Sequence, residues 1–236
     1  MSRTGAEAAK ISEREIFMKH KYSLAVFDLD GTVLDTLGDL AASTNFALGE
    51  YGLPARSIDE VRRFVGNGIR LLIERAVPEN TAPETVDGVF EAFRAHYAAH
   101  CADTTRAYDG TERLLCDLRT AGIKTAVVSN KADFAVKELC GRYFEGLFDI
   151  AVGERENIRR KPAPDSVLEV MKSLSATPGE TVYIGDSDVD IMTAKNAGTH
   201  CISVTWGFRD RAFLLANGAY DLADTVGELE EKLTAF

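Results

Sequence analysis

The sequence has no apolar stretch that approaches the length of a membrane-spanning helix. It also lacks an excess of basic residues, because 27 Lys and Arg stand against 37 Asp and Glu, for a formal net charge of −10. Proteins that bind nucleic acids or anionic membranes need clustered cations, so neither partner is expected. A small anionic substrate stays compatible with this charge, because a single cleft can be locally positive.

Paired or clustered cysteines are also absent. The four cysteines lie far apart without a Cys-x-x-Cys motif, which is typical of free thiols in a reducing cytoplasm and does not predict a zinc site. Residues 1–19 carry scattered charges and no continuous apolar core, so we interpret them as an N-terminal tail and not as a secretory signal. The expected location is the cytoplasm. The cysteines are Cys101, Cys116, Cys140 and Cys201.

Short apolar runs recur along the chain, each of a length suited to a buried strand. Segments with helical periodicity lie between them. Strands that alternate with helices predict a parallel sheet covered by helices on both faces, a Rossmann-like α/β fold. The runs are 22–27, 123–128, 148–152, 181–184 and 201–204.

One segment, residues 36–107, breaks this alternation. It contains no convincing strand, and its helical patterns, among them residues 58–64 and 69–76, are interrupted by glycine and proline. We therefore predict an α/β core formed by residues 20–35 and 108–236, with an all-helical cap of residues 36–107 inserted after the first strand. The expected joints are Thr36–Gly38 and Thr104–Asp109.

Polar side chains follow four of the predicted strands. Ligands bind at the carboxyl ends of the strands in an open parallel sheet, so we expect these side chains to meet at one edge. Clustered carboxylates repel one another and need a counter-charge. A divalent cation with a phosphate group fits that need, because Mg²⁺ prefers oxygen ligands. The side chains are Asp28, Asp30, Ser129, Asn130, Lys161, Asp186 and Asp190.

The order of these residues resembles the haloacid dehalogenase-like phosphohydrolase superfamily. The matching elements are Asp28-x-Asp30-Gly31-Thr32, Ser129, Lys161-Pro162 and the Gly-Asp-x-x-x-Asp stretch at 185–190. The resemblance extends from about residue 22 to residue 207. It implies a Mg²⁺-dependent phosphomonoester hydrolase that acts through an aspartyl-phosphate intermediate.

The same resemblance implies a role for each residue. Asp28 would be the nucleophile and a Mg²⁺ ligand, and Asp30 the general acid and base, with its backbone carbonyl on the metal. Asp186 would be the third protein ligand, and Asp190 would orient Lys161 or a metal-bound water. The phosphoryl oxygens would be bound by Thr32, Ser129, Asn130 and Lys161.

Within the superfamily, the chain is most similar to bacterial phosphoglycolate phosphatases. The similarity includes Val65-Gly66-Asn67-Gly68 and Ser129-Asn130-Lys131. It implies 2-phosphoglycolate, or a similar small phosphorylated metabolite, as the substrate, with Gly66 and Asn67 near it.

A carboxylate on such a substrate calls for a cation in the cap. The candidates flank the glycine-rich turn and are Arg62, Arg63 and Arg70. An equally good interpretation is that these arginines only form the solvated basic edge of two helices. Arg160 and Val189 depart from the usual pattern of that group.

Other chemistries of the superfamily stay in view. A pyrophosphatase or a broad-specificity phosphatase would share the same core residues. Haloacid dehalogenases lack an acid two residues after the nucleophile, so Asp30 disfavours that chemistry. β-Phosphoglucomutase-like enzymes usually carry valine or a similar residue at the position of Thr32, so Thr32 disfavours them. Phosphonate-cleaving members need a lysine in the cap, and the absence of lysine between Lys21 and Lys124 excludes them. The intact acids disfavour a non-catalytic binding protein. Both a monomer and a homodimer are compatible with the sequence.

Overall fold

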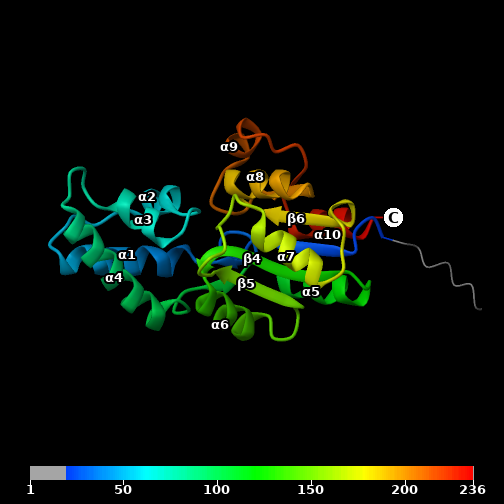
Figure 1. Ribbon diagram of the computed structural model, residues 1–236, viewed down its shortest axis with the longest axis horizontal. Helices are drawn as coiled ribbons and strands as arrows, with labels where there is room; N and C mark the ends of the chain where they lie inside the picture. Colours follow the sequence, from blue (N-terminus) through cyan, green and yellow to red (C-terminus); the bar gives the residue numbers. More distant parts are fainter. Residues whose placement is uncertain (1–19, 236) are drawn as a thin grey trace, which may run out of the picture.

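The computed structural model describes residues 20–235 and is built around a six-stranded sheet (Figure 1). All paired neighbours in this sheet are parallel, in the order β5-β4-β1-β6-β7-β8. The predicted fold class is confirmed, and the predicted tail of residues 1–19 lies outside the described residues. The strands are β1 Leu24–Phe27, β4 Lys124–Ala132, β5 Ile150–Glu154, β6 Thr181–Gly185, β7 His200–Val204 and β8 Leu222–Ala223.

Helices cover both faces of the sheet because successive strand side chains point to opposite sides. Leu24 and Val26 of β1 belong to the apolar cluster that includes α7 and α8, whereas Ala25 and Phe27 belong to the cluster on the other face. That second cluster includes α5, α6 and α10. The bounds are α5 Thr111–Thr120, α6 Asp133–Tyr143, α7 Asp165–Ser173, α8 Asp188–Ala197, α9 Arg211–Ala216 and α10 Val226–Thr234, with a short 3₁₀ turn at Pro178–Glu180.

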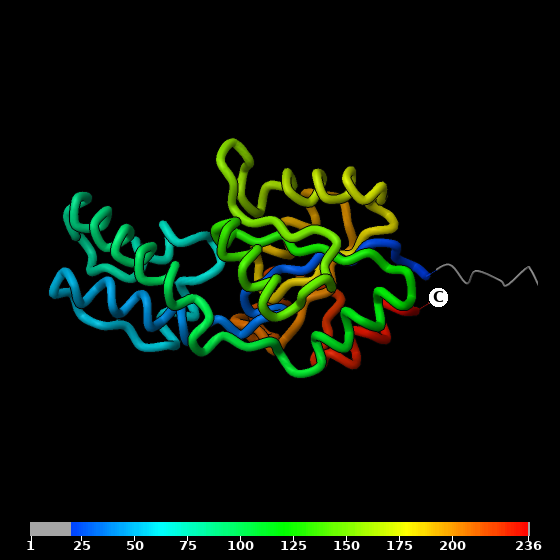
Figure 2. The backbone as a smooth tube through the Cα atoms, turned by 90° about the horizontal axis from the view of Figure 1, so that it is seen from below, coloured from blue at the N-terminus to red at the C-terminus, as the bar shows by residue number. Residues whose placement is uncertain are grey.

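Four helices form a separate group at the end of the sheet to which the strands point (Figures 1 and 2). They match the predicted helical insertion, and α2 and α3 have the predicted bounds. α1 and α4 pack along each other and bury Leu48, Phe93 and Tyr97. The division into a core and a cap that moves as a unit stays a prediction. The helices are α1 Leu37–Glu50, α2 Ile58–Phe64, α3 Ile69–Ala76 and α4 Pro83–His100.

The two joints between the sheet core and the group of four helices are connected by hydrogen bonds. The short strands β2 (Leu34–Asp35) and β3 (Arg106–Ala107), which the sequence did not predict, pair antiparallel there. Beside them, the buried Asp39 carboxylate accepts the backbone N–H groups of Thr104 at 2.8 Å and Thr105 at 2.9 Å, and the Thr104 hydroxyl at 2.6 Å. The entering and leaving chain segments are therefore held side by side.

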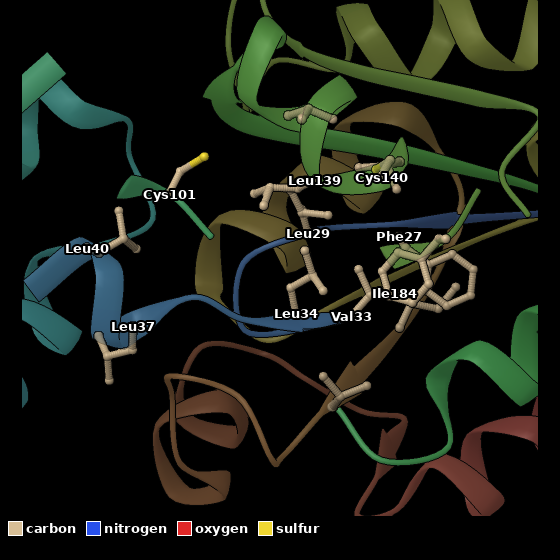
Figure 3. Close-up of a cluster of buried hydrophobic side chains, with 14 of the residues drawn as sticks. Phe27, Leu29, Val33, Leu34, Leu37, Leu40, Cys101, Leu139, Cys140 and Ile184 are labelled. Atoms are coloured by element: carbon tan, nitrogen blue, oxygen red, sulfur yellow. The ribbon is translucent and has the colours of Figure 1, made fainter. Parts of the chain in front are cut away.

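The loop after β1 is anchored by apolar packing. One buried cluster continues from Phe27 and Ile184 in the sheet, through Leu29 and Leu34 in the loop, to Leu37 at the start of α1 (Figure 3). Leu29 is fully buried, and its carbonyl oxygen accepts three backbone N–H groups of the following turn. The residues on either side of Leu29 therefore occupy fixed positions.

No helix among residues 20–235 is both long and apolar enough to cross a membrane. The cytoplasmic location and the oligomeric state stay predictions.

We expect Asp39 to stabilise the joint in a pH-dependent manner. Burial raises the pKa of Asp39, but the hydrogen bonds from Thr104 and Thr105 outweigh it and hold the pKa below its usual range. Replacing Asp39 with Asn should lower the free energy of unfolding by about 1–3 kcal/mol near neutral pH. This difference should disappear as the pH falls through the low pKa of the folded state, because the carboxyl is then protonated.

Urea denaturation at neutral pH and at a series of acidic pH values measures how the difference between the two proteins falls. Asp87→Asn is the control, because Asp87 pairs with Arg70 at the surface and should contribute less than about 1 kcal/mol. An equal loss for the two variants at neutral pH would refute the role of Asp39.

Candidate active site

Asp28 and Asp30 lie at the carboxyl end of β1, on either side of the buried Leu29. Asp28 is 8% exposed, and its Oδ1 accepts the Leu29 N–H at 2.7 Å and contacts Lys161 Nζ at 2.9 Å. Gly31 then turns the chain with a φ of +81°, and a Cβ atom at that position would collide with the Asp186 carboxylate. The turn therefore requires glycine.

Lys161 forms the cationic wall of the site. Its buried ammonium group lies 2.9 Å from Asp28 Oδ1 and 2.8 Å from Asp190 Oδ1, and it donates to the Tyr183 hydroxyl at 3.1 Å. The peptide bond between Lys161 and Pro162 is cis. The contact with Asp28 places the Lys161-Pro162 element against the Asp28-x-Asp30 element, as the sequence predicted.

Asp190 is fully engaged by protein groups. Its Oδ1 contacts Lys161 and lies 3.3 Å from the Tyr183 hydroxyl, and its Oδ2 accepts the Ser187 N–H at 3.1 Å and the Ser187 hydroxyl at 2.6 Å. The contacts with Ser187 form a capping box at the start of α8. Asp190 therefore fixes both Lys161 and the first turn of this helix.

Asp186 follows β6 and is 2% exposed. Its Oδ2 accepts the Phe208 N–H at 2.6 Å, and its Oδ1 accepts the Thr32 hydroxyl at 3.4 Å. Gly207 lies against it so closely that a Cβ atom there would meet both Asp186 and the Gly31 carbonyl. Backbone from two loops thus encloses this carboxylate.

The carboxylates have too little positive charge around them. Burial raises the pKa of Asp28 to about 6, an effect that Lys161 partly offsets, and burial raises the pKa of Asp186 well above its usual range. Oxygen atoms of Asp28, Asp186 and Asp190 lie within 4.8 Å of one another. Such a buried, all-oxygen set fits a hard divalent cation, which would supply the missing charge.

Ser129 and Asn130 lie near the end of β4, where the sequence placed them. The Asn130 side chain accepts the Lys161 N–H at 2.8 Å and donates to the carbonyl oxygens of Lys161 and Gly66, each at 3.1 Å. It therefore links two core loops to the cap. The buried Ser129 hydroxyl accepts the Lys131 N–H at 3.3 Å.

Asp30 is held by two residues to which the sequence analysis gave no role. Its Oδ1 accepts the Thr36 hydroxyl at 2.7 Å and the Lys131 ammonium at 2.8 Å. Lys131 also donates to the Tyr97 hydroxyl of α4 at 2.5 Å. The signal for Lys131 was its place in the Ser129-Asn130-Lys131 motif, but nothing in the sequence pointed to Tyr97.

A cavity of about 50 Å³ lies between the core and the cap. Gly66 lines it, whereas Arg63 and Asn67 line a wider groove beside it. Arg70 pairs with Glu74 and Asp87 on a partly exposed face. The core residues that line the cavity are Asp28, Asp30, Ser129, Asn130, Lys131, Asp186, Ser187, Phe208 and Arg209.

A parallel sheet with acids at its carboxyl edge, a buried lysine beside them and a helical insertion over them define a hydrolytic α/β enzyme with a capped active site. Residues 25–204 match the model of one family, the haloacid dehalogenase-like hydrolases. The chain belongs to this family, as the motifs predicted, and it is a phosphatase.

Similar proteins with a curated description agree with this assignment. The phosphoglycolate phosphatase of Aquifex aeolicus is 34% identical over 184 residues, which cover 78% of this chain and 84% of that protein. Phosphoglycolate phosphatase 1 of Pseudomonas aeruginosa is 33% identical, with 78% and 70% covered. Among solved structures, a protein from Lactobacillus delbrueckii subsp. bulgaricus matches with a TM-score of 0.88 and 37% identity over 92% of this chain and all of that one.

We expect Gly207→Ala to weaken metal binding, because the added Cβ atom would displace the Asp186 carboxylate. The concentration of divalent cation needed for half-maximal activity should rise by about 10–100-fold, the range found when the support of a metal ligand is disturbed. Titration of activity with Mg²⁺ measures this value.

Gly141→Ala is the matched control. Gly141 lies on the exposed side of α6 with no atom within 4 Å of an added Cβ, so this variant should keep its metal dependence and gain up to about 1 kcal/mol of stability. The same Mg²⁺ dependence in both variants would show that Gly207 does not shape the site.

Proposed function

We propose that the protein hydrolyses 2-phosphoglycolate with Mg²⁺, through a phosphoryl group carried on Asp28. The observation that carries this proposal is the arrangement of Asp28 between Lys161 and Asp186. Both protein contacts given above for Asp28 are to Oδ1, so among the described residues Oδ2 is the oxygen open to a substrate. This geometry supports nucleophilic attack by a carboxylate whose other oxygen is fixed.

The residues that would hold Mg²⁺ are Asp28, Asp186 and the backbone carbonyl of Asp30. Asp190 pairs with the Lys161 ammonium group through Oδ1 and accepts two Ser187 donors at Oδ2, whereas each Asp186 oxygen accepts one neutral donor. This difference supports a role for Asp190 in positioning Lys161 and not in direct coordination. When bound, the cation withdraws negative charge from the phosphoryl oxygens. The Ser129 hydroxyl would bind the same oxygens, with Thr32 beside them, and Lys161 would add positive charge next to them.

Asp28 would attack phosphorus opposite the leaving oxygen, and Asp30 would give its proton to that oxygen as the ester bond breaks. The alcohol then leaves, and Asp30 takes a proton from the water that attacks the phosphoryl group. The P–O bond to Asp28 breaks, inorganic phosphate is released, and both carboxyl groups return to their initial states. The hydrogen bonds from Thr36 and Lys131 support this role, because they fix Asp30 next to Asp28.

The choice of substrate rests on two observations. Relatives at 33–34% identity are named phosphoglycolate phosphatases. The cavity of about 50 Å³ holds only a few water-sized groups, which suits a two-carbon leaving group better than a sugar. A pyrophosphatase would have the same core, and direct comparison of substrates separates the two.

We expect Asp28→Asn to abolish turnover of 2-phosphoglycolate at saturating Mg²⁺, because the amide is a poor nucleophile. Asp188→Asn should keep nearly full activity, since Asp188 lies two residues from Asp186 but outside the set of site contacts. Excess chelator should stop the wild-type enzyme. Steady-state phosphate release measures all three.

Turnover in excess chelator would refute the metal requirement, and activity of Asp28→Asn would refute the covalent route. A higher kcat/KM for pyrophosphate than for 2-phosphoglycolate would favour the pyrophosphatase alternative.

We expect Asp30→Asn to separate the two halves of the reaction. Loss of the proton donor should slow cleavage of an alkyl ester by about 10²–10⁴-fold. It should slow p-nitrophenyl phosphate much less, because nitrophenolate leaves without a proton. Hydrolysis of the aspartyl-phosphate also loses its general base. With the aryl ester, the enzyme should therefore release a burst of nitrophenol and then stop with phosphate on Asp28.

Rapid-mixing kinetics with both esters, together with the mass of the intact protein, measure these effects. Equal losses for both esters, with no burst and no added phosphate, would assign Asp30 a purely structural role.

A further inference from the structure

The side of the cavity next to Asp30 carries two hydrogen-bond donors that the proposed mechanism does not use. Lys131, near the end of β4, is 5% exposed, and Tyr97, on α4 of the cap, is 2% exposed. Lys131 Nζ lies 2.8 Å from Asp30 Oδ1 and 2.5 Å from the Tyr97 hydroxyl, and both residues line the cavity. A buried lysine at the active site calls for an explanation.

Each of the two groups retains one donor. An ammonium group has three N–H bonds, and the contacts with Asp30 and Tyr97 use two of them. The Tyr97 oxygen accepts from Lys131, so its own hydrogen is available. Among residues 20–235, no further partner of either polar group is found. One N–H and one O–H therefore remain side by side, as the two oxygens of a carboxylate require.

Of the three arginines that the sequence suggested, two are engaged elsewhere, and Arg63 lines the adjacent groove instead of the cavity. Arg62 pairs with Asp59 at 2.9 Å, and Arg70 pairs with Glu74 at 2.7 Å and Asp87 at 2.5 Å. The other cation that lines the cavity, Arg209, donates to the Arg62 and Val65 carbonyl oxygens at the end of α2. Of the cations described at the cavity wall, Lys131 is the one whose remaining donor is next to the general acid.

We propose that Lys131 and Tyr97 together bind a carboxylate on the leaving group of the substrate, and so select a phosphomonoester of a 2-hydroxy acid. This inference rests on the proposed function. The position suits it, because Asp30 must reach the ester oxygen and the carboxylate of such a substrate is one carbon further away. Since Lys131 belongs to the core and Tyr97 to the cap, the site is complete only when α4 lies against β4.

The rival explanation is that Lys131 only positions Asp30. The two explanations differ in which substrate loses kcat/KM, because a displaced general acid lowers kcat/KM for every alkyl phosphate. Ethyl phosphate has the same two-carbon chain as 2-phosphoglycolate but no carboxylate, so the ratio of the two kcat/KM values isolates carboxylate recognition.

The test uses Tyr97→Phe, Lys131→Met and, as a control, Tyr143→Phe, which removes a hydroxyl bonded to the Thr105 carbonyl. Tyr97→Phe should lower the ratio by at least about tenfold, because the site loses a hydrogen bond that only the carboxylate accepts. Lys131→Met should slow both esters and lower the ratio further. Tyr143→Phe should leave the ratio unchanged.

The same ratio is then measured as dissociation constants in an Asp28→Asn background, by calorimetry, so that the result does not depend on turnover. An unchanged ratio in both Tyr97→Phe and Lys131→Met would overturn the proposal, as would wild-type protein that does not prefer 2-phosphoglycolate. A selective loss in Arg63→Ala but not in Tyr97→Phe would overturn it by placing recognition in the adjacent groove. Failure of the proposed function is distinct, because the wild-type protein would then release no phosphate from 2-phosphoglycolate or would prefer pyrophosphate.

Discussion

The contact between the Lys161 ammonium and the carboxylates of Asp28 and Asp190 is the constraint on which the rest of the site depends. Removing one partner of a buried ion pair leaves an uncompensated charge and costs several kcal/mol. Here one lysine serves two carboxylates, and Asp186 adds a third acid at short range. The cluster is therefore short of positive charge until a cation joins it. This shortage is costly for folding, but it is what suits the site to a divalent cation.

The hydrophobic core offsets this cost, because it fixes the backbone from which the acidic side chains project. Leu29 is buried between Asp28 and Asp30, so the core holds the loop from which both carboxylates project. Around Asp186 the support is backbone, because Gly31 and Gly207 approach closer than any side chain permits. Carboxylates mounted in this way cannot move apart to relieve their repulsion. The rigidity of the hydrophobic core is thus transmitted directly to the charged site (Figure 3).

The sequence predicted the parts of the fold that have strong local patterns. Apolar runs marked five strands of the sheet, and glycine and proline bounded α2 and α3 correctly. The C-terminal β8, α9 and α10 were all missed. For β8 and α9 the reason is physical, because a two-residue strand and a six-residue helix have no periodicity to detect. The order of the motifs predicted that the acids lie close together, but it could not show which cationic side chain lines the cavity. The Glu74 at i+4 from Arg70 was a visible sign that this arginine pairs along its own helix.

The contacts that join core and cap at the active site are mostly polar and use backbone acceptors. Arg209 donates to carbonyl groups at the end of α2, Asn130 donates to the Gly66 carbonyl, and Arg160 donates to the Asn67 carbonyl at 3.2 Å. Water can replace each of these bonds, so each contributes only about 0.5–1.5 kcal/mol. The joint at Asp39, in contrast, is buried and multiply bonded. We therefore predict that the cap separates from the core at this interface at little cost while the joint at Asp39 stays intact. A substrate that bridges β4 and α4 therefore needs to supply only a few kcal/mol to favour the closed arrangement.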